Sequence, residues 1–147
     1  MHLPASLLVF AVIAASSQSA ATPTKGQFRA RLSVVPIDVT MQNVVAGSGM
    51  VTATLTGNKL SVNGTFADLK SPATVARIHV APKGLNGPAQ LDLQVTPGTS
   101  GTITGSFELT PAQVRDLTTH RFYIQLHSEK APEGNLRGWL LPQETRR

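Results

Sequence analysis

The stretch VARIHVAPKGLNGPAQLDLQV, which runs from Val75 to Val95, decides the fold of this chain. Its first six residues alternate apolar side chains with Arg77 and His79, and this period of two is typical of a strand that buries one face. Glycine and proline then gather in residues 81–88, where they predict a loop. The last residues of the stretch alternate again. The stretch therefore predicts two half-buried strands joined by a turn-rich loop.

Short runs of the same kind recur on both sides of this stretch, from Phe28 to Leu141. Gly57-Asn58 separates two of them by residues that both tolerate a positive φ, which predicts a tight hairpin. Thr110, followed by Pro111 and by Gln113, predicts the start of one short helix, because this spacing forms a capping box. Several short strands with turns between them indicate an all-β domain, either a sandwich or a barrel.

Residues 1–21 have the layout of a secretory signal peptide. An apolar stretch from Leu3 to Ala15 is followed by small and polar residues as far as Ala21. The apolar stretch is shorter than the roughly 20 residues that cross a bilayer, so we expect no transmembrane anchor after signal cleavage. We expect cleavage after Ala21, or alternatively after Ser19, and a single exported domain over residues 22–147.

Composition limits the classes of partner. The 147 residues contain 13 Lys and Arg against 8 Asp and Glu, a formal net charge of +5, and no Lys or Arg precedes Lys25. This excess favours acidic partners, among them anionic polysaccharide, lipid headgroups or nucleic acid, although the first expectation for scattered basic residues is a solvated surface that keeps the protein soluble. The basic residues are scattered without a run of five, which argues against nucleic acid. The chain has no cysteine, so disulfides, thiolate metal sites and cysteine nucleophiles are excluded.

Three motifs occur in a fixed order along the chain. They are Ala76-Arg77-Ile78-His79 followed by Gly87-Pro88, the strand Tyr123-Ile124-Gln125-Leu126-His127-Ser128, and the ending Pro132-Glu133-Gly134-Asn135-Leu136-Arg137-Gly138. In this order and spacing, over residues 28–141, the chain resembles the chordin-type (CHRD) domain family. Arg77 stands where the family usually has a histidine, and Asn135 where it usually has a glutamate. A metal-site interpretation loses a ligand at each position.

The resemblance implies an extracellular domain that folds as an immunoglobulin-like antiparallel Greek-key β-sandwich with one short helix. The family includes the repeats of chordin, which are associated with growth factors of the bone morphogenetic protein class, and single domains of exported bacterial proteins. A shared fold does not fix a partner. For a single domain we therefore expect a secreted or periplasmic location and either a protein partner or an anionic extracellular ligand.

The polar faces of the predicted strands supply the candidate binding residues. We expect one polar cluster with histidines hydrogen-bonded to the backbone or to Glu133, and arginines paired with nearby acids such as Asp92. The five residues of this predicted cluster are Arg77, His79, His127, Glu133 and Arg137. The loop of residues 82–88 is a second candidate surface. We expect no cofactor.

A metal site is the alternative hypothesis, because His79 and His127 lie on polar faces of strands that could be neighbours. A loose likeness between this kind of sandwich and copper-zinc superoxide dismutase points the same way. Zinc and copper need three or four ligands in fixed geometry, and Arg77 beside the histidines would repel a metal ion. The two histidines are therefore expected to be structural members of the polar cluster.

The sequence has none of the common catalytic motifs. It contains no nucleophile elbow and no His-Glu-x-x-His, and Gly47-Ser48-Gly49 lacks the third glycine and the following helix of a phosphate-binding loop. We expect an exported, non-catalytic binding or structural module.

Overall fold

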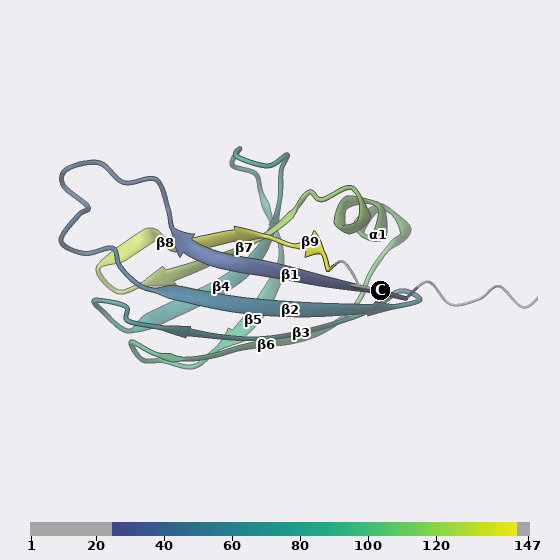
Figure 1. The fold of residues 1–147 in the computed structure, drawn as a ribbon, viewed down its shortest axis with the longest axis horizontal. Coiled ribbons are helices and arrows are strands. Elements are labelled where there is room, and N and C mark those ends of the chain that lie inside the picture. The colour runs from purple at the N-terminus through teal and green to yellow at the C-terminus, as the bar shows by residue number, and fades with distance from the viewer. Residues whose placement is uncertain (1–24, 144–147) are drawn as a thin grey trace, which may run out of the picture.

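The structure is a computed structural model that describes residues 25–143. The predicted signal peptide and its cleavage site lie outside these residues. The described chain forms nine strands and one helix (Figure 1). In chain order these elements are β1 (Lys25–Val34), β2 (Ser48–Thr56), β3 (Lys59–Ala67), β4 (Ala73–Val80), β5 (Ala89–Val95), β6 (Gly101–Glu108), α1 (Pro111–Thr118), β7 (Phe122–Ser128), β8 (Ala131–Trp139) and β9 (Leu141–Pro142).

Eight of the strands close into an antiparallel barrel. Around the ring they follow the order β1, β2, β3, β6, β5, β4, β7 and β8, and β8 pairs with β1 again. The short strand β9 pairs with the first half of β1, opposite Phe28 and Arg29. Strands β4, β5 and β6 neighbour each other in chain order and β7 returns beside β4, which is the Greek-key order.

The all-β class and the short helix are confirmed, but the immunoglobulin-like sandwich is wrong. In a sandwich, two sheets pack face to face and are not hydrogen-bonded to each other along their edges. Here two strand pairs connect the halves of the structure along both edges, and this closes the barrel. Strand β1 pairs with β8 at Ser33–Arg137 and Val34–Leu136, and β5 pairs with β6 at Gln94–Thr104 and Val95–Ile103. The alternation of apolar residues reports only which face of each strand is buried. It is the same in both architectures, so it could not reveal this closure.

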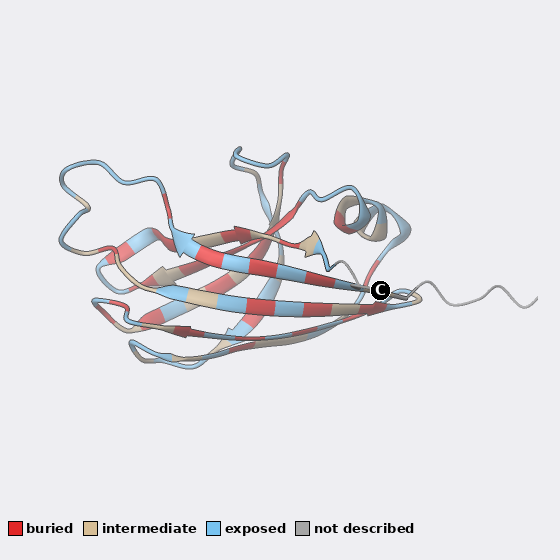
Figure 2. Cartoon of the chain, in the orientation of Figure 1, coloured by how far each residue is buried: buried red, intermediate tan, exposed pale blue. Residues whose placement is uncertain are grey.

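One hydrophobic core fills the inside of the barrel. On β1, Phe28, Ala30 and Leu32 are buried while Arg29 and Arg31 are exposed, and Figure 2 shows the same alternation along β1 and β2. The helix covers one end of the barrel and adds Leu117 to this core. Inside residues 25–143, no helix has the length and apolar character needed to cross a membrane.

Local signals placed the turns and the helix correctly. Gly57 has φ of 64° in the hairpin between β2 and β3. The Thr110 side chain accepts a hydrogen bond from the backbone N–H of Gln113 at 3.2 Å, and the Gln113 side chain accepts one from the backbone N–H of Thr110 at 2.9 Å. The predicted capping box is therefore confirmed, since both reciprocal bonds are present.

The closure between β1 and β8 depends on Gly138. A Cβ atom at this position would clash with the backbone carbonyl oxygen of Arg31 on the facing strand. The two backbones can approach only because residue 138 has no side chain.

We predict that Gly138→Ala lowers the free energy of unfolding by about 2 kcal/mol, because the added methyl group must push β1 away from β8. Urea denaturation followed by circular dichroism measures the loss. Gly98→Ala is the control: its added Cβ would come no closer than 3.1 Å to another residue, so we expect a change below about 1 kcal/mol. Equal losses in both variants would contradict the role given to Gly138.

Candidate functional site

Two side chains on the outer face of strand β7 are buried although they lie outside the core. Tyr123 is 1% exposed and Gln125 is 6% exposed, while their chain neighbours Phe122 and Ile124 point into the barrel. The sequence predicted a solvent-exposed polar row along this face of β7. Instead the row lies beneath the loop of residues 81–88 and beneath side chains of β8, which together form a second layer.

Tyr123 is at the centre of this layer. Its ring stacks on that of His79 with centroids 5.0 Å apart, and it meets the Trp139 ring at 4.8 Å. The guanidinium carbon of Arg137 lies 5.4 Å from the centroid of the Tyr123 ring, within the range of a cation–π interaction. Three strands thus contribute to one stack of side chains, because β4, β7 and β8 are adjacent in the sheet.

The same side chains anchor the loop between β4 and β5. The Tyr123 hydroxyl accepts a hydrogen bond from Gly87 N at 3.0 Å and donates one to Gly87 O at 3.2 Å. His79 Nδ1 donates to the same carbonyl at 2.9 Å, and Trp139 Nε1 donates to Ala81 O at 3.1 Å. Both ends of the loop are therefore bound to the barrel, and its tip projects from fixed positions.

The five residues of the predicted cluster do not form one site. Arg77 points toward β5 and pairs with Asp92 at 2.9 Å, as expected, although the Asp92 side chain is largely exposed and that of Arg77 is partly exposed. Glu133 contributes its backbone carbonyl, which accepts a hydrogen bond from Gln125 Nε2 at 3.0 Å. Arg137 Nε donates to Gln125 Oε1 at 3.1 Å. The structure thus links Arg137 to Glu133 through Gln125, a residue that the sequence analysis did not select.

His79 and His127 both bind the backbone, which was one of the two expected partners. His127 Nδ1 donates to Pro132 O at 2.8 Å, so in both rings Nδ1 carries the proton and Nε2 is left without a partner among the described residues. The register pairs His79 with Tyr123 and His127 with Val75, so the histidines lie four residues apart, about 13 Å along the strand. Among residues 25–143, no group of three or more His, Asp or Glu side chains could hold a metal ion.

The surroundings of His79 favour its neutral form. Burial lowers the pKa of this imidazole below its usual value, and the hydrogen bond to Gly87 O opposes that effect. His127 in its protonated form, Arg77 and Arg137 lower the pKa of His79 further by like-charge repulsion. A metal cation placed between the two histidines would face the same positive field.

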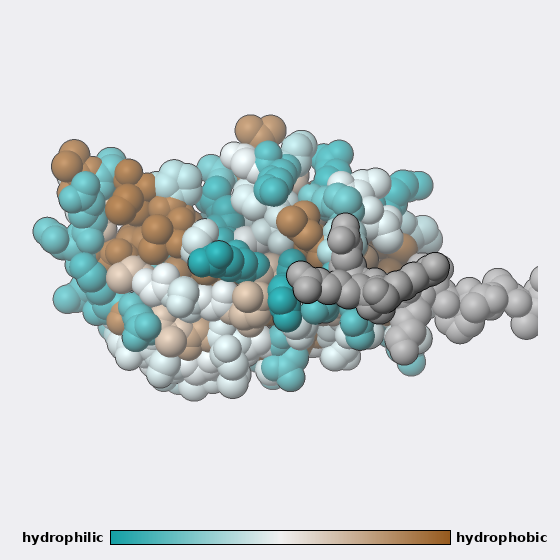
Figure 3. Space-filling model, in the orientation of Figure 1, coloured by the Kyte–Doolittle hydropathy of each residue, from teal (hydrophilic) through white to brown (hydrophobic). Residues whose placement is uncertain are grey.

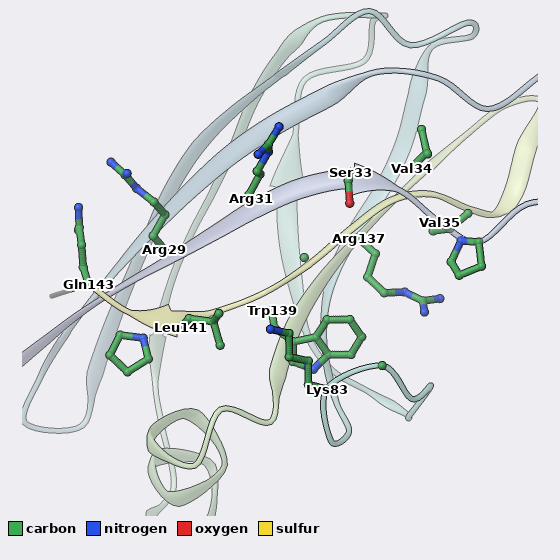
Figure 4. Close-up of a pocket in the computed structure, with 14 residues that line it drawn as sticks. Arg29, Arg31, Ser33, Val34, Val35, Lys83, Arg137, Trp139, Leu141 and Gln143 are labelled. Atoms are coloured by element: carbon green, nitrogen blue, oxygen red, sulfur yellow. The ribbon is translucent and has the colours of Figure 1, made fainter.

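Next to this layer, positively charged side chains line a groove of about 680 Å³ beside the β1–β8 pairing. We call it the basic groove, and Figure 4 shows the side chains that line it. Arg29 and Arg31 project from β1, Arg137 and Trp139 come from β8, and Lys83 comes from the anchored loop. Apolar residues complete its walls, namely Val34, Val35, Pro36, Leu141 and Pro142.

No acidic residue lines the basic groove within the described part of the chain. Two ion pairs occur in residues 25–143, Arg77–Asp92 and Arg121–Asp116, so neither involves one of the four groove cations. Four like charges around one groove create a positive potential that attracts anions.

Comparison with known families supports the resemblance seen in the motifs. The model of the CHRD domain matches residues 28–140, which is most of the chain. The chain belongs to the CHRD domain family. Searches of curated proteins and of solved structures found no match to it.

Of the groove residues of this CHRD domain, the sequence pointed to Arg137 and, through the candidate loop of residues 82–88, to Lys83, but not to Arg29 or Arg31. Arg29 and Arg31 gave a signal, since two arginines at alternate positions of a strand must share one face. Nothing in the sequence, however, placed that face beside Lys83 and Arg137, which lie far along the chain. The pairing of β1 with β8 supplies this proximity.

We predict that acidification below about pH 6.5 destabilises the CHRD domain partly through His79. The folded pKa is lowered, so the unfolded chain binds the proton more readily, and the stability due to neutral His79 is lost as the pH falls. His79→Asn keeps a polar group near Gly87 O but cannot titrate. Thermal melts from pH 7.5 to 5 should show a smaller pH dependence for this variant than for wild type, with His120→Asn, a change at an exposed histidine, as control. Parallel curves for wild type and His79→Asn would contradict the assignment.

Proposed function

We propose that this protein is an exported, non-catalytic CHRD-domain binding module whose basic groove takes an anionic ligand. The observation that supports the proposal is the gathering of Arg29, Arg31, Lys83 and Arg137 around one groove with no acid among its described lining residues. The apolar N-terminal stretch of the sequence supports export. The location is secreted or periplasmic.

The groove cations differ in how firmly they are positioned. Arg137 is oriented by its bond to Gln125 and by the Tyr123 ring, whereas Arg29, Arg31 and Lys83 are exposed. One fixed guanidinium gives a preferred position for an anion, because its donors have a set direction. The exposed cations contribute mainly to attraction over longer distances.

Arg77 is a weaker candidate for anion binding. Its guanidinium already pairs with Asp92, and the carboxylate offsets its charge. Of the five residues that the sequence proposed for binding, Arg137 is the one that lines the basic groove.

We predict that Arg29→Gln/Arg31→Gln weakens binding of heparin, a soluble sulfated polyanion, about tenfold, since each exposed charge contributes up to about 1 kcal/mol. Isothermal titration calorimetry at low ionic strength measures the affinity. Arg115→Gln/Lys130→Gln removes the same net charge from exposed positions outside the groove and serves as control.

The proposal requires the two double variants to differ. Equal weakening by both would show that net charge alone attracts heparin, and no measurable binding by wild type would refute anion binding at the groove. Mass spectrometry of the exported protein tests the proposed export, because an intact Met1 would contradict cleavage of the signal peptide.

A further inference from the structure

We propose that the basic groove and the two loops beside it form a docking surface for a lipid bilayer rich in anionic phospholipid. This inference rests on the proposed anion-binding function and names the anion as the phosphate of a lipid headgroup. Its distinguishing feature is a set of exposed aliphatic side chains, of which Val34 lines the groove and the others lie on the two loops that border it. Their exposed fractions are 41% for Val34, 40% for Ile37, 79% for Val39 and 59% for Leu85.

These side chains come from two loops that border the same groove. Val34, Val35 and Pro36 line it where the β1–β2 loop begins, and Ile37 and Val39 follow directly. Lys83 and Gly84 line it from the β4–β5 loop, and Leu85 is the next residue. Figure 3 shows hydrophobic surface over the β1–β2 loop and a separate hydrophobic tip on the β4–β5 loop, both on the same side of the molecule.

The β1–β2 loop has a built structure that projects Val39. The carboxylate of Asp38 accepts hydrogen bonds from Thr40 N at 2.8 Å, Thr40 Oγ1 at 2.6 Å and Met41 N at 3.2 Å, which closes a turn. The base of the loop is packed in a small cluster of its own, which consists of Val35, Val45 and Ala131 with Met41 and Val44 against them. The loop therefore has an apolar anchor of its own and still leaves Val39 in water.

The β4–β5 loop is fixed in a comparable way. Tyr123, His79 and Trp139 bind its ends, and Leu85 N donates to Pro82 O at 3.0 Å in a turn at its tip. Gly84 has φ of 90° in this turn, which favours glycine. Leu85 is thus exposed by a defined backbone conformation.

Together these features fit a bilayer better than a soluble polyanion. Exposed aliphatic side chains gain nothing from a sulfated polysaccharide, whereas the boundary between headgroups and acyl chains offers apolar contact beside phosphate. Lys and Arg near an anionic membrane surface each strengthen binding several-fold. Asp38 opposes this attraction, but its charge is bonded within its own turn and four groove cations outnumber it.

Co-sedimentation with vesicles tests the inference on protein recovered from the exported fraction. We expect wild type to sediment with phosphatidylglycerol-containing vesicles and much less with pure phosphatidylcholine vesicles. Val39→Ser/Leu85→Ser should bind the anionic vesicles about tenfold more weakly, because both side chains lose apolar burial. Val39→Leu/Leu85→Met keeps the apolar surface and should bind like wild type.

Heparin binding separates this inference from the proposed function. We expect Val39→Ser/Leu85→Ser to bind heparin as wild type does, since its cations are unchanged. Heparin binding by wild type without vesicle binding, or equal vesicle binding by the serine variant and wild type, would overturn the membrane inference and leave anion binding in place. If wild type binds neither heparin nor anionic vesicles, both the membrane inference and the proposed anion-binding function are overturned.

Discussion

The pairing of β1 with β8 is the constraint on which the rest of the structure depends. It rests on two residue pairs, Ser33–Arg137 and Val34–Leu136, and on the missing side chain of Gly138, which lets β8 approach the backbone of Arg31. This pairing closes the barrel and sets the basic strand β1 beside β8. The basic groove exists because both strands contribute cations to its lining on the outside of the barrel.

Strand β8 connects the groove to the layer of buried side chains behind it. Arg137 and Trp139 line the groove, and both also contact Tyr123, whose hydroxyl binds the β4–β5 loop. The polar motifs of the family therefore have a structural use in this chain: His79 and Tyr123 fix a loop that contributes Lys83 to the groove. Such a buried aromatic layer outside the core holds the β4–β5 loop in one position, because its hydrogen bonds and stacking leave few alternative arrangements.

The charges on this face and its small number of metal ligands both bear on the charge of the proposed ligand. The field that lowers the pKa of His79 includes Arg77 and Arg137, and the groove that Arg137 lines has three further cations, Arg29, Arg31 and Lys83. The metal-binding alternative gains no third ligand from the described residues, and the two histidines are separated by four positions of strand register. These observations support the proposed anionic ligand over a metal ion.

The sequence by itself determined the family, the all-β class, the hairpin at Gly57 and the capped helix at Thr110. The hairpin and the helix depend on residues within a few positions of each other, and the family and the class depend on the order of such short patterns along the chain. Only the tertiary structure decided that the sheets close into a barrel, that Tyr123 and Gln125 are buried outside the core, and that Arg31, Lys83 and Arg137 surround one groove. Each of these depends on which strands pair at long range, and the period-two pattern of a strand is the same whichever neighbour it has.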